Sequence, residues 1–594
     1  MSKGQVTMKP PDADEPYAGQ QPADNSDKSP VEVPRFMGRQ IPPLDRVLIM
    51  VIPPVLIVAA VIWVIVDSDG AAQAISTMRT FVTSEFTWLF ILYSLVALIV
   101  CIWAAFSKFG KVRLGGPAAK PLHGRFAWYS MLFACGQGIG LIFWSVAEPI
   151  MLRDENPVIP VTPTSGAEEG AIVWTYFHWG LTAWAMYCVV ALCLAYSHHN
   201  LGKTLTFREA TVDILPKKAQ RPAGVVIELL AIIATVLGLA TSFGFAAMQF
   251  SSGVTSFTGL DSGPGMWMIV IGVFATITGI SAYIGINKGM ARLSVINSIL
   301  SIVLVGAVFI FGPTIYMIST MTQTFGSFGQ HFLSMSFFTD FQLAATSLDT
   351  WQDSWNGWWT VFIWCWVIAF SPFVAGFVAR ISRGRTIREF VIGVTVVPSL
   401  IVMFWVGVIG VASIYYDDQT GRAISEGVAS DTSSGLFLML DQLPLVGTVM
   451  LVVATILVGT YYVTSLDAGS YALGEFVTAP RKSSPFFRVI LVISIGTVAT
   501  VLLSIGGEAV VDTVQTGTII GAFPFSFVIL LMIANFIRRL HKRNQQTRKM
   551  ERAINDPDPD RVLIPDPEGE GFVEPAEQDT TVASRPPRDE TPPS

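Results

Sequence analysis

The feature that most limits how this chain can fold is a series of long apolar segments along most of its length. Twelve of them reach about 20 residues, the length that an α-helix needs to cross a bilayer. They are centred near residues 56, 96, 138, 184, 238, 276, 302, 368, 402, 458, 495 and 527. Of the 594 residues, only 14% are charged, against about 25% in soluble domains. The sequence predicts an all-α integral membrane protein with 12 transmembrane helices.

The loops between these segments alternate in charge. Lys and Arg cluster after every second segment, whereas residues 313–356 contain neither. Because cytoplasmic loops are enriched in Lys and Arg, we expect a multi-pass protein of the cell (plasma) membrane with both termini in the cytoplasm. Residues 1–45 are expected to form a disordered N-terminal tail and residues 46–540 the core. Residues 541–594, basic and then acidic and Pro-rich, are expected to form a C-terminal tail.

The third apolar segment contains the stretch ACGQGIGLIFW, residues 134–144. Gly136, Gly138 and Gly140 each weaken a helix by about 1 kcal/mol relative to alanine, and in a bilayer every freed backbone group needs a partner. A helix interrupted at mid-membrane exposes amides and carbonyls that can bind an ion and a substrate carboxylate. The alternative is close packing of helices through small residues.

A second interruption is expected five segments later, at residues 369–372, because Pro372 lacks a backbone donor and clashes with the preceding turn. Interruptions at corresponding places are typical of transporters built from inverted repeats. The sequence therefore predicts two inverted repeats of five helices, segments 3–7 and 8–12, preceded by two extra helices.

Aromatic residues gather on single faces of two segments. At about 100° per residue, Trp179, Trp184 and Tyr187 fall on one side of the fourth segment. Trp366 and Phe370 are spaced i, i+4 and can share a face of the eighth. Converging ring faces bind a cation that has no hydrogen-bond donors, such as trimethylammonium. The alternative for these rings is packing against lipid or other helices.

Hydroxyl groups lie inside the tenth segment. Thr464 and Ser465 are hard oxygen ligands that could complete a sodium site with carbonyls of the interrupted third segment. Such hydroxyls more often bond to the preceding helical turn. Asp467 has no assigned role. The sequence has no nucleophile–base or metal constellation, so we do not expect an enzyme.

Four stretches resemble the betaine/carnitine/choline transporter family, and the likeness covers about residues 45–550. They are GQGIG, FHWGLTAWAMY, the TSLD of segment ten and ARISRGRTIREF, residues 379–390. The resemblance implies a leucine-transporter-like fold of two five-helix inverted repeats, alternating access and a homotrimer. It implies an aromatic box that contains Trp179, Trp184 and Tyr187. It also implies a sodium site formed by the backbone of Ala134 and Gln137, by Tyr461, and by the hydroxyls of Thr464 and Ser465.

The chain departs from the family pattern at several positions. Val367 and Phe370 stand where family members often have tryptophan, and Gln137 stands where methionine is common. Choline-type members resemble this chain but have Asp where it has Gly140. A cation without its own carboxylate would need that counter-charge, so Gly140 favours a zwitterion.

We therefore expect a secondary active transporter that imports a betaine-type compatible solute, with glycine betaine as the expected substrate, coupled to sodium. The quaternary ammonium would contact the aromatic residues, and the carboxylate would face Gly136, Gln137, Gly138 and Gly140. No cofactor is expected beyond sodium as the coupling ion, and no nucleic acid partner. Open alternatives are a sodium-independent betaine/carnitine exchanger, sodium- or proton-coupled uptake of choline or another small zwitterion, and a membrane sensor without transport.

Overall fold

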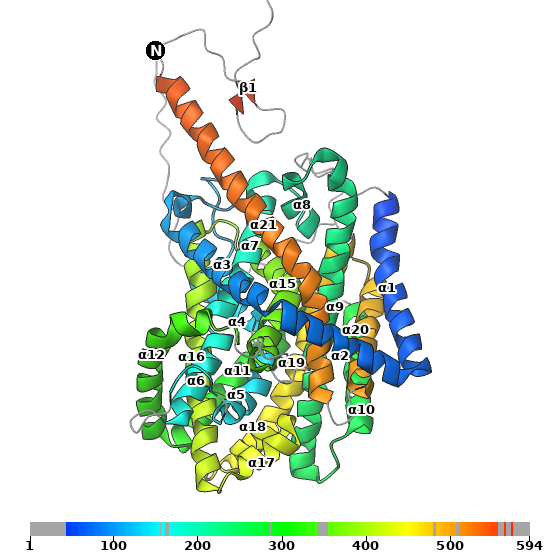
Figure 1. Ribbon diagram of the computed structural model, residues 1–594, viewed down its shortest axis with the longest axis vertical. Helices are drawn as coiled ribbons and strands as arrows, with labels where there is room; N and C mark the ends of the chain where they lie inside the picture. The colour runs from blue at the N-terminus through cyan, green and yellow to red at the C-terminus, as the bar shows by residue number, and fades with distance from the viewer. Residues whose placement is uncertain are drawn as a thin grey trace, which may run out of the picture. The chain divides into compact units, whose positions relative to one another are not determined.

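The computed structural model describes most of the chain. It covers residues 43–136, 138–154, 156–160, 166–284, 287–340, 354–478, 483–505, 510–555, 564–565 and 572–573. Within these ranges the regular structure is helical (Figure 1), apart from one antiparallel pair of two-residue strands, β1 (Ile564–Pro565) and β2 (Phe572–Val573), in which Ile564 lies opposite Val573. The expectation of an all-helical architecture is confirmed.

Eleven helical segments of these residues are long and apolar enough to cross a membrane. They are α1 (Pro43–Val66), α3 (Thr87–Phe106), α6 with α7 (Ala167–Trp179, Leu181–Leu201), α9 (Lys217–Thr258), α10 (Pro264–Ile284), α11 (Asn287–Phe311), α14 with α15 (Trp355–Trp358, Thr360–Ile381), α16 (Ile387–Gln419), α19 (Gly447–Thr478), α20 (Pro485–Ile505) and α21 (Val510–Asn555). They correspond to eleven of the predicted segments. The count of twelve crossings and the inverted repeat stay predictions.

The remaining predicted segment, the third, is divided into two shorter helices. α4 (Arg125–Gly136) ends at the first glycine of the motif, and α5 (Ile139–Leu152) begins after the second. Gly138 precedes α5 with φ −70° and ψ −100°, and as a glycine it has no side chain with which to cap the first amides of α5. The interruption predicted from the glycines is therefore present. Gln137 lies outside the described residues.

The prediction of an interruption at residues 369–372 is wrong, because α15 runs continuously through Pro372. A proline removes one donor but leaves the other helical bonds in place, and α15 is packed against α7, α9 and α21 along its length. The break in this part of the chain lies at Trp359, between α14 and α15, with φ −108° and ψ −80°. A further break, at Gly180 between α6 and α7, was not expected from the sequence.

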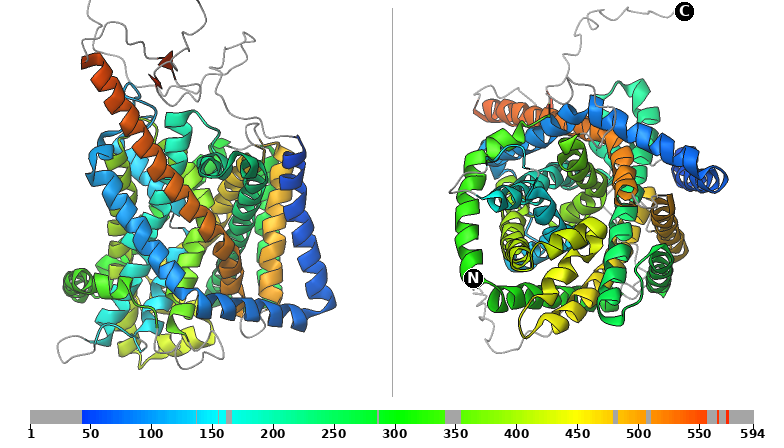
Figure 2. Two further views of the ribbon diagram at one scale, coloured as in Figure 1. Left: turned by 45° about the horizontal axis from the view of Figure 1, so that its top comes forward. Right: turned by 60° about the horizontal axis from the view of Figure 1, so that its bottom comes forward.

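Two helices run across the others. α2 (Ser68–Glu85) lies crosswise between the ends of α1 and α3, and α12 (Thr314–Ser336) is seen end-on at the edge of the bundle (Figure 2, left). Asp67 caps α2 by accepting a hydrogen bond from the Gly70 amide at 2.9 Å. The fully buried Arg79 then donates to the carbonyl of Asp512 at 2.9 Å and to Gln515 Oε1 at 2.8 Å, which fixes α2 against α21.

Short helices mark the two ends of the bundle. η1 (Lys108–Lys111), α8 (Phe207–Thr211) and η2 (Val212–Ile214) belong to the basic loops, whereas α17 (Ala423–Ser430), η4 (Thr432–Ser434) and α18 (Gly435–Asp441) belong to an acidic one. Figure 1 shows α8 and the C-terminal half of α21 at one end, with α17 and α18 at the other. α21 continues to Asn555, so the basic stretch beyond residue 541 extends a helix of the core.

Candidate functional site

Two glycines of the interrupted third segment touch aromatic residues closely enough to exclude a side chain. A methyl group added at Gly136 would lie 2.4 Å from Cη2 of Trp184. One added at Gly140 would lie 2.9 Å from Cη2 of Trp366 and 3.1 Å from the ring of Trp179. The absence of side chains therefore lets these indoles approach the broken helix, and the structure brings together residues that lie far apart in the sequence.

A cavity lies at the break between α4 and α5. It is lined by Gly136, Gly138, Ile139, Gly140, Leu141, Trp179, Tyr187, Ser242, Phe243, Ile363, Trp366, Val367, Phe370 and Ser465. Four of the five aromatic residues predicted for the box are in this lining. Trp184 is not: it is fully buried behind Gly136, where its ring contacts Tyr187 edge-on with the centroids 5.7 Å apart.

The two tryptophans of the cavity have fixed orientations. Trp179 and Trp366 meet nearly at right angles, with centroids 5.7 Å apart and planes inclined by 83°. Trp366 donates from Nε1 to Oγ of Ser242 at 3.0 Å, and Phe362 stacks on it with centroids 5.6 Å apart. No sequence pattern distinguishes Ser242, which is one of several hydroxyl residues of α9 that bond to the preceding helical turn.

Behind Trp179 lies a buried polar cluster that the sequence reasoning missed. Trp179 Nε1 donates to Oε2 of Glu148 at 2.6 Å, and Nδ1 of His178 lies 2.6 Å from Oε1 of the same carboxylate. Nε2 of His178 lies 3.0 Å from Oγ1 of Thr360. An ionisable residue within an apolar segment is a functional candidate by default, and Glu148 and His178 both carried that signal.

Of the two hydroxyl residues predicted on α19, Ser465 is the one that lies at the break. Ser465 lines the cavity, and its Oγ would lie 3.6 Å from a methyl group added at Gly138. Thr464 donates to the carbonyl of Thr460 at 2.9 Å, as expected for a hydroxyl bonded to the preceding turn. It also accepts a hydrogen bond of 3.0 Å from Nδ2 of Asn297 in α11, a partner that the sequence did not indicate.

The other residues predicted for the sodium site are only partly placed. The ring of Tyr461 lies against the glycine motif, 3.1 Å from a methyl group added at Gly138. Its hydroxyl points away from that motif and lies 3.2 Å from Oγ of Ser301. Ala134 belongs to α4, close to the C-terminal end of that helix. Gln137 lies outside the described residues.

A second, larger cavity of about 500 Å³ begins at the hydroxyl residues. Ser465 lines both cavities, and the larger one extends past Asp467 to Arg380 and Arg488. These arginines follow predicted segments eight and ten and so belong to the basic end of the bundle. The larger cavity therefore leads from the glycine break toward the basic side.

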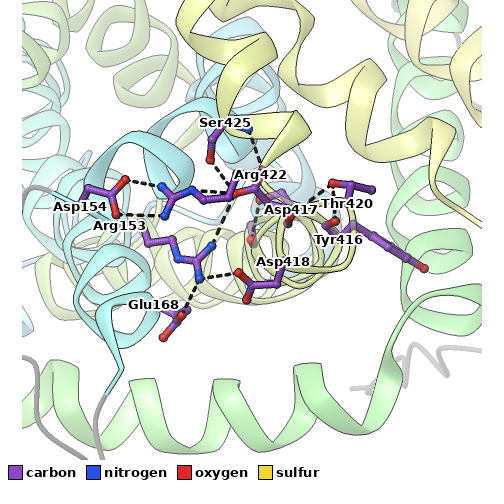
Figure 3. Close-up of polar contacts among 11 residues, drawn as sticks. Arg153, Asp154, Glu168, Tyr416, Asp417, Asp418, Thr420, Arg422 and Ser425 are labelled. Atoms are coloured by element: carbon purple, nitrogen blue, oxygen red, sulfur yellow. Dashed lines mark hydrogen bonds and ion pairs between the residues drawn. The ribbon is translucent and has the colours of Figure 1, made fainter.

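Charged residues link the helices at the opposite end (Figure 3). Arg153, just after α5, pairs with Glu168 of α6 at 2.9 Å and with Asp418 of α16 at 2.6 Å. Arg422 pairs with Asp154, and the amide of Ser425 in α17 donates to the buried Asp417 at 2.8 Å. These contacts, which we call the acidic-end network, join α5, α6, α16 and α17.

The sequence matches the family described as BCCT, betaine/carnitine/choline family transporter, over residues 48–545. The chain is similar to the glycine betaine transporter OpuD of Bacillus subtilis (strain 168), with 36% identity over 496 residues, 83% of this chain and 94% of that protein. Glycine betaine transporter 1 of Vibrio parahaemolyticus is 34% identical over 81% of this chain and 91% of its own length. The ectoine/hydroxyectoine transporter of Virgibacillus pantothenticus is 34% identical over 78% of this chain and 90% of its own length.

These matches span the helical core, including the glycine break and the residues around it. The relatives are named as transporters and not as enzymes. The chain is a multi-pass membrane transporter, and it belongs to the betaine/carnitine/choline transporter family.

Proposed function

We propose that this protein imports glycine betaine, or a closely related betaine, together with sodium. The observation that carries the proposal is the cavity at the α4–α5 break, which combines aromatic rings with the start of a helix whose N-cap residue is a glycine. Two of the similar proteins are named glycine betaine transporters, which supports the same substrate class.

The two ends of a betaine would bind to different parts of the cavity. Its trimethylammonium group has no hydrogen-bond donors, and the faces of Trp179, Tyr187 and Trp366 supply cation–π contacts. Its carboxylate would bind to the amides at the start of α5, which Gly138 cannot cap with a side chain and where the helix dipole is positive. Ile139 and Leu141 of this first turn both line the cavity.

Sodium would bind on the other side of the break. The hydroxyls of Thr464 and Ser465 are the proposed ligands, together with backbone groups of Ala134 and Gln137 and with Tyr461. The position of Ser465 beside Gly138 supports this site, since an ion there would touch both α19 and the broken segment. Sodium binding would then favour the arrangement of α19 and α5 that binds the substrate.

Alternating access would carry the substrate from the acidic end of the bundle to the basic end. The larger cavity supports an inner pathway, because it runs from Ser465 toward Arg380 and Arg488. The acidic-end network supports a closed outer side in the same conformation. With basic loops in the cytoplasm, both termini would lie there as well. A twelve-helix core with two inverted repeats is part of this proposal.

The test is uptake of radiolabelled glycine betaine by proteoliposomes, with an inward sodium gradient or with potassium instead. We expect uptake only with sodium. The double variant Thr464→Ala, Ser465→Ala should lose at least about tenfold in uptake at low sodium, because two ligands are removed. Thr460→Ala is the matched control, since Thr460 lies one turn earlier on α19 and its hydroxyl donates to carbonyls of its own helix.

Other results of this test point to the alternatives. Uptake that is equal with sodium and potassium would favour an exchanger or proton coupling. Sodium-dependent uptake of the double variant at the wild-type level would contradict the proposed ligands. Absence of betaine uptake would direct attention to ectoine, which one similar protein is named as transporting.

A homotrimer is the proposed assembly. Large apolar side chains on α12, namely Ile315, Phe325 and Leu333, are exposed in the single chain, which supports contacts with other copies or with lipid. Native mass spectrometry of the protein in detergent should give the mass of three chains. A monomer mass under conditions that keep the protein active would contradict this assembly.

A further inference from the structure

A carboxylate with no charged arginine or lysine partner in the described residues lies directly behind the proposed cation site. Glu148 of α5 is 0% exposed, and so is His178 of α6. The hydrogen-bonded chain runs from Trp179 to Glu148, then to His178 and on to Thr360, the first residue of α15. It therefore joins three helices that all begin or end at the backbone breaks described above.

Only one of the four residues in this hydrogen-bonded series lines the cavity. Trp179 contributes to the lining, whereas Glu148, His178 and Thr360 do not. The pyrrole N–H edge of the indole is turned to the carboxylate, while its six-membered ring lies beside Gly140 at the cavity. Glu148 therefore contacts the lining of the cavity through the indole of Trp179 and is not itself part of the lining.

The physics of a buried carboxylate gives this arrangement a consequence for ligands. A hydrogen bond to an ionised acceptor is stronger than a neutral one, so it fixes the indole in one orientation. An ionised acceptor would also make the ring face more attractive to a cation, by an amount that the neighbouring His178 imidazole, 2.6 Å from the same carboxylate, would reduce if it were protonated. A neutral head group of the same shape would bind more tightly because the Trp179 indole has a fixed orientation, but it would gain nothing from the charge of Glu148.

We propose that Glu148 acts through Trp179 to make the cavity prefer a cationic head group over a neutral one of the same shape. Glu148 is a positioning residue, and the inference rests on the proposed function because it assumes that a betaine binds beside Trp179. It goes beyond that function by naming the residue that sets the discrimination between charged and uncharged head groups.

The experiment compares two ligands that differ only at the head group. Glycine betaine carries a trimethylammonium group, and 3,3-dimethylbutanoate carries a tert-butyl group on the same acetate. Equilibrium binding of each radiolabelled compound to the purified full-length protein in sodium buffer gives a selectivity ratio. We expect Glu148→Gln to lower this ratio by about tenfold, mainly through weaker binding of betaine. A purely structural role would weaken both ligands equally and leave the ratio unchanged.

Two further variants serve as controls. One tests the effect of losing any buried carboxylate, and the other tests the effect of losing the last hydrogen bond of the series from Trp179 to Thr360. Glu228→Gln removes another fully buried carboxylate, one that accepts from the amide of Arg208 away from the cavity. Thr360→Val removes the hydrogen bond between His178 and Thr360 but keeps the contact between Glu148 and Trp179. Both should retain the wild-type ratio within about twofold.

The outcomes separate the inference from the function on which it rests. Wild-type protein that binds neither compound would overturn the proposed function and the inference together. Wild-type binding of betaine with an unchanged ratio in Glu148→Gln would overturn the inference alone. If Glu148→Gln does not fold, Glu148→Asp is the second variant, since it keeps the charge but withdraws it from the indole. Its ratio should fall below that of the wild type, and an unchanged ratio would overturn the inference.

Discussion

At the scale of single residues, the glycines of the third segment are sites of close contact. Gly136 faces Trp184, Gly138 faces Tyr461, and Gly140 faces two indoles. Their unusual spacing predicted a helix break, because three glycines in five residues remove much of the local preference for helix. The partners could not be predicted in the same way, since they come from other segments of the chain, the nearest of them 39 residues away.

Replacing single glycines by alanine can distinguish the cost of a steric clash from the gain in helix propensity. Gly136→Ala places a methyl group 2.4 Å from Trp184, so we expect a loss of about 1–3 kcal/mol in stability. Gly272→Ala in α10 is the control, because nothing lies within 4 Å of the added methyl group, and helix preference alone should stabilise it by up to about 1 kcal/mol. Thermal unfolding of the purified proteins in detergent measures both. Equal stability of the two variants would contradict the close contact at Gly136.

At the scale of helices, the sequence predicted most elements from apolar length and charge but failed where tertiary contacts decide. Pro372 signalled a break, yet packing on three neighbouring helices keeps α15 continuous. The crosswise α2 and α12 are not apolar enough to be recognised as membrane crossings, and α2 is held by Arg79, whose partners include backbone, amide and hydroxyl oxygens far along the chain. Such partners leave no local pattern.

The joint between η2 and α21 gives a prediction about pH. Burial alone would raise the pKa of Asp213, but Arg539 of α21 and Lys203 lie against its carboxylate and lower the pKa below the ordinary 3.8. A lowered pKa in the folded protein stabilises the fold above the ordinary value, and this contribution is lost as the pH falls through the folded pKa.

We therefore expect Asp213→Asn to be about 1 kcal/mol less stable than the wild type at pH 7. The difference should persist down to about pH 5 and shrink as the pH falls below 3.8. Thermal unfolding across this pH range measures the effect, with the exposed Asp261→Asn as control. A difference that stayed constant down to pH 3 would show that the ion pairs do not stabilise the fold.

At the scale of the whole molecule, the two ends differ in which of them the larger cavity approaches. The larger cavity reaches the basic end, while the acidic-end network joins four helices at the other. The charges of the loops predicted which loops lie together at the basic end and which lie together at the acidic end. They could not predict which of them the larger cavity would approach, since that depends on how helices distant in sequence pack together.

The closed end can be tested by labelling from outside. Arg153→Gln removes contacts to Glu168 and Asp418, so we expect the outward-open population to rise by about fivefold. A cysteine at position 370, in a chain whose own cysteines are replaced, should then react correspondingly faster with an impermeant maleimide added outside intact cells. Arg125→Gln breaks an exposed pair with Glu389 at the basic end and should leave the rate unchanged. Equal rates in all three proteins would contradict a role for the network in closure.

The position of Gly140 also bears on how such transporters can change their substrate during evolution. The choline-type pattern places an Asp here, but in this chain any side chain would collide with Trp179 and Trp366. The first mutational step toward that pattern would damage the existing site before a new one could form. A viable path would begin with smaller residues at the two tryptophan positions, so ancestors between the two substrate types are expected to show relaxed selectivity first and the carboxylate second.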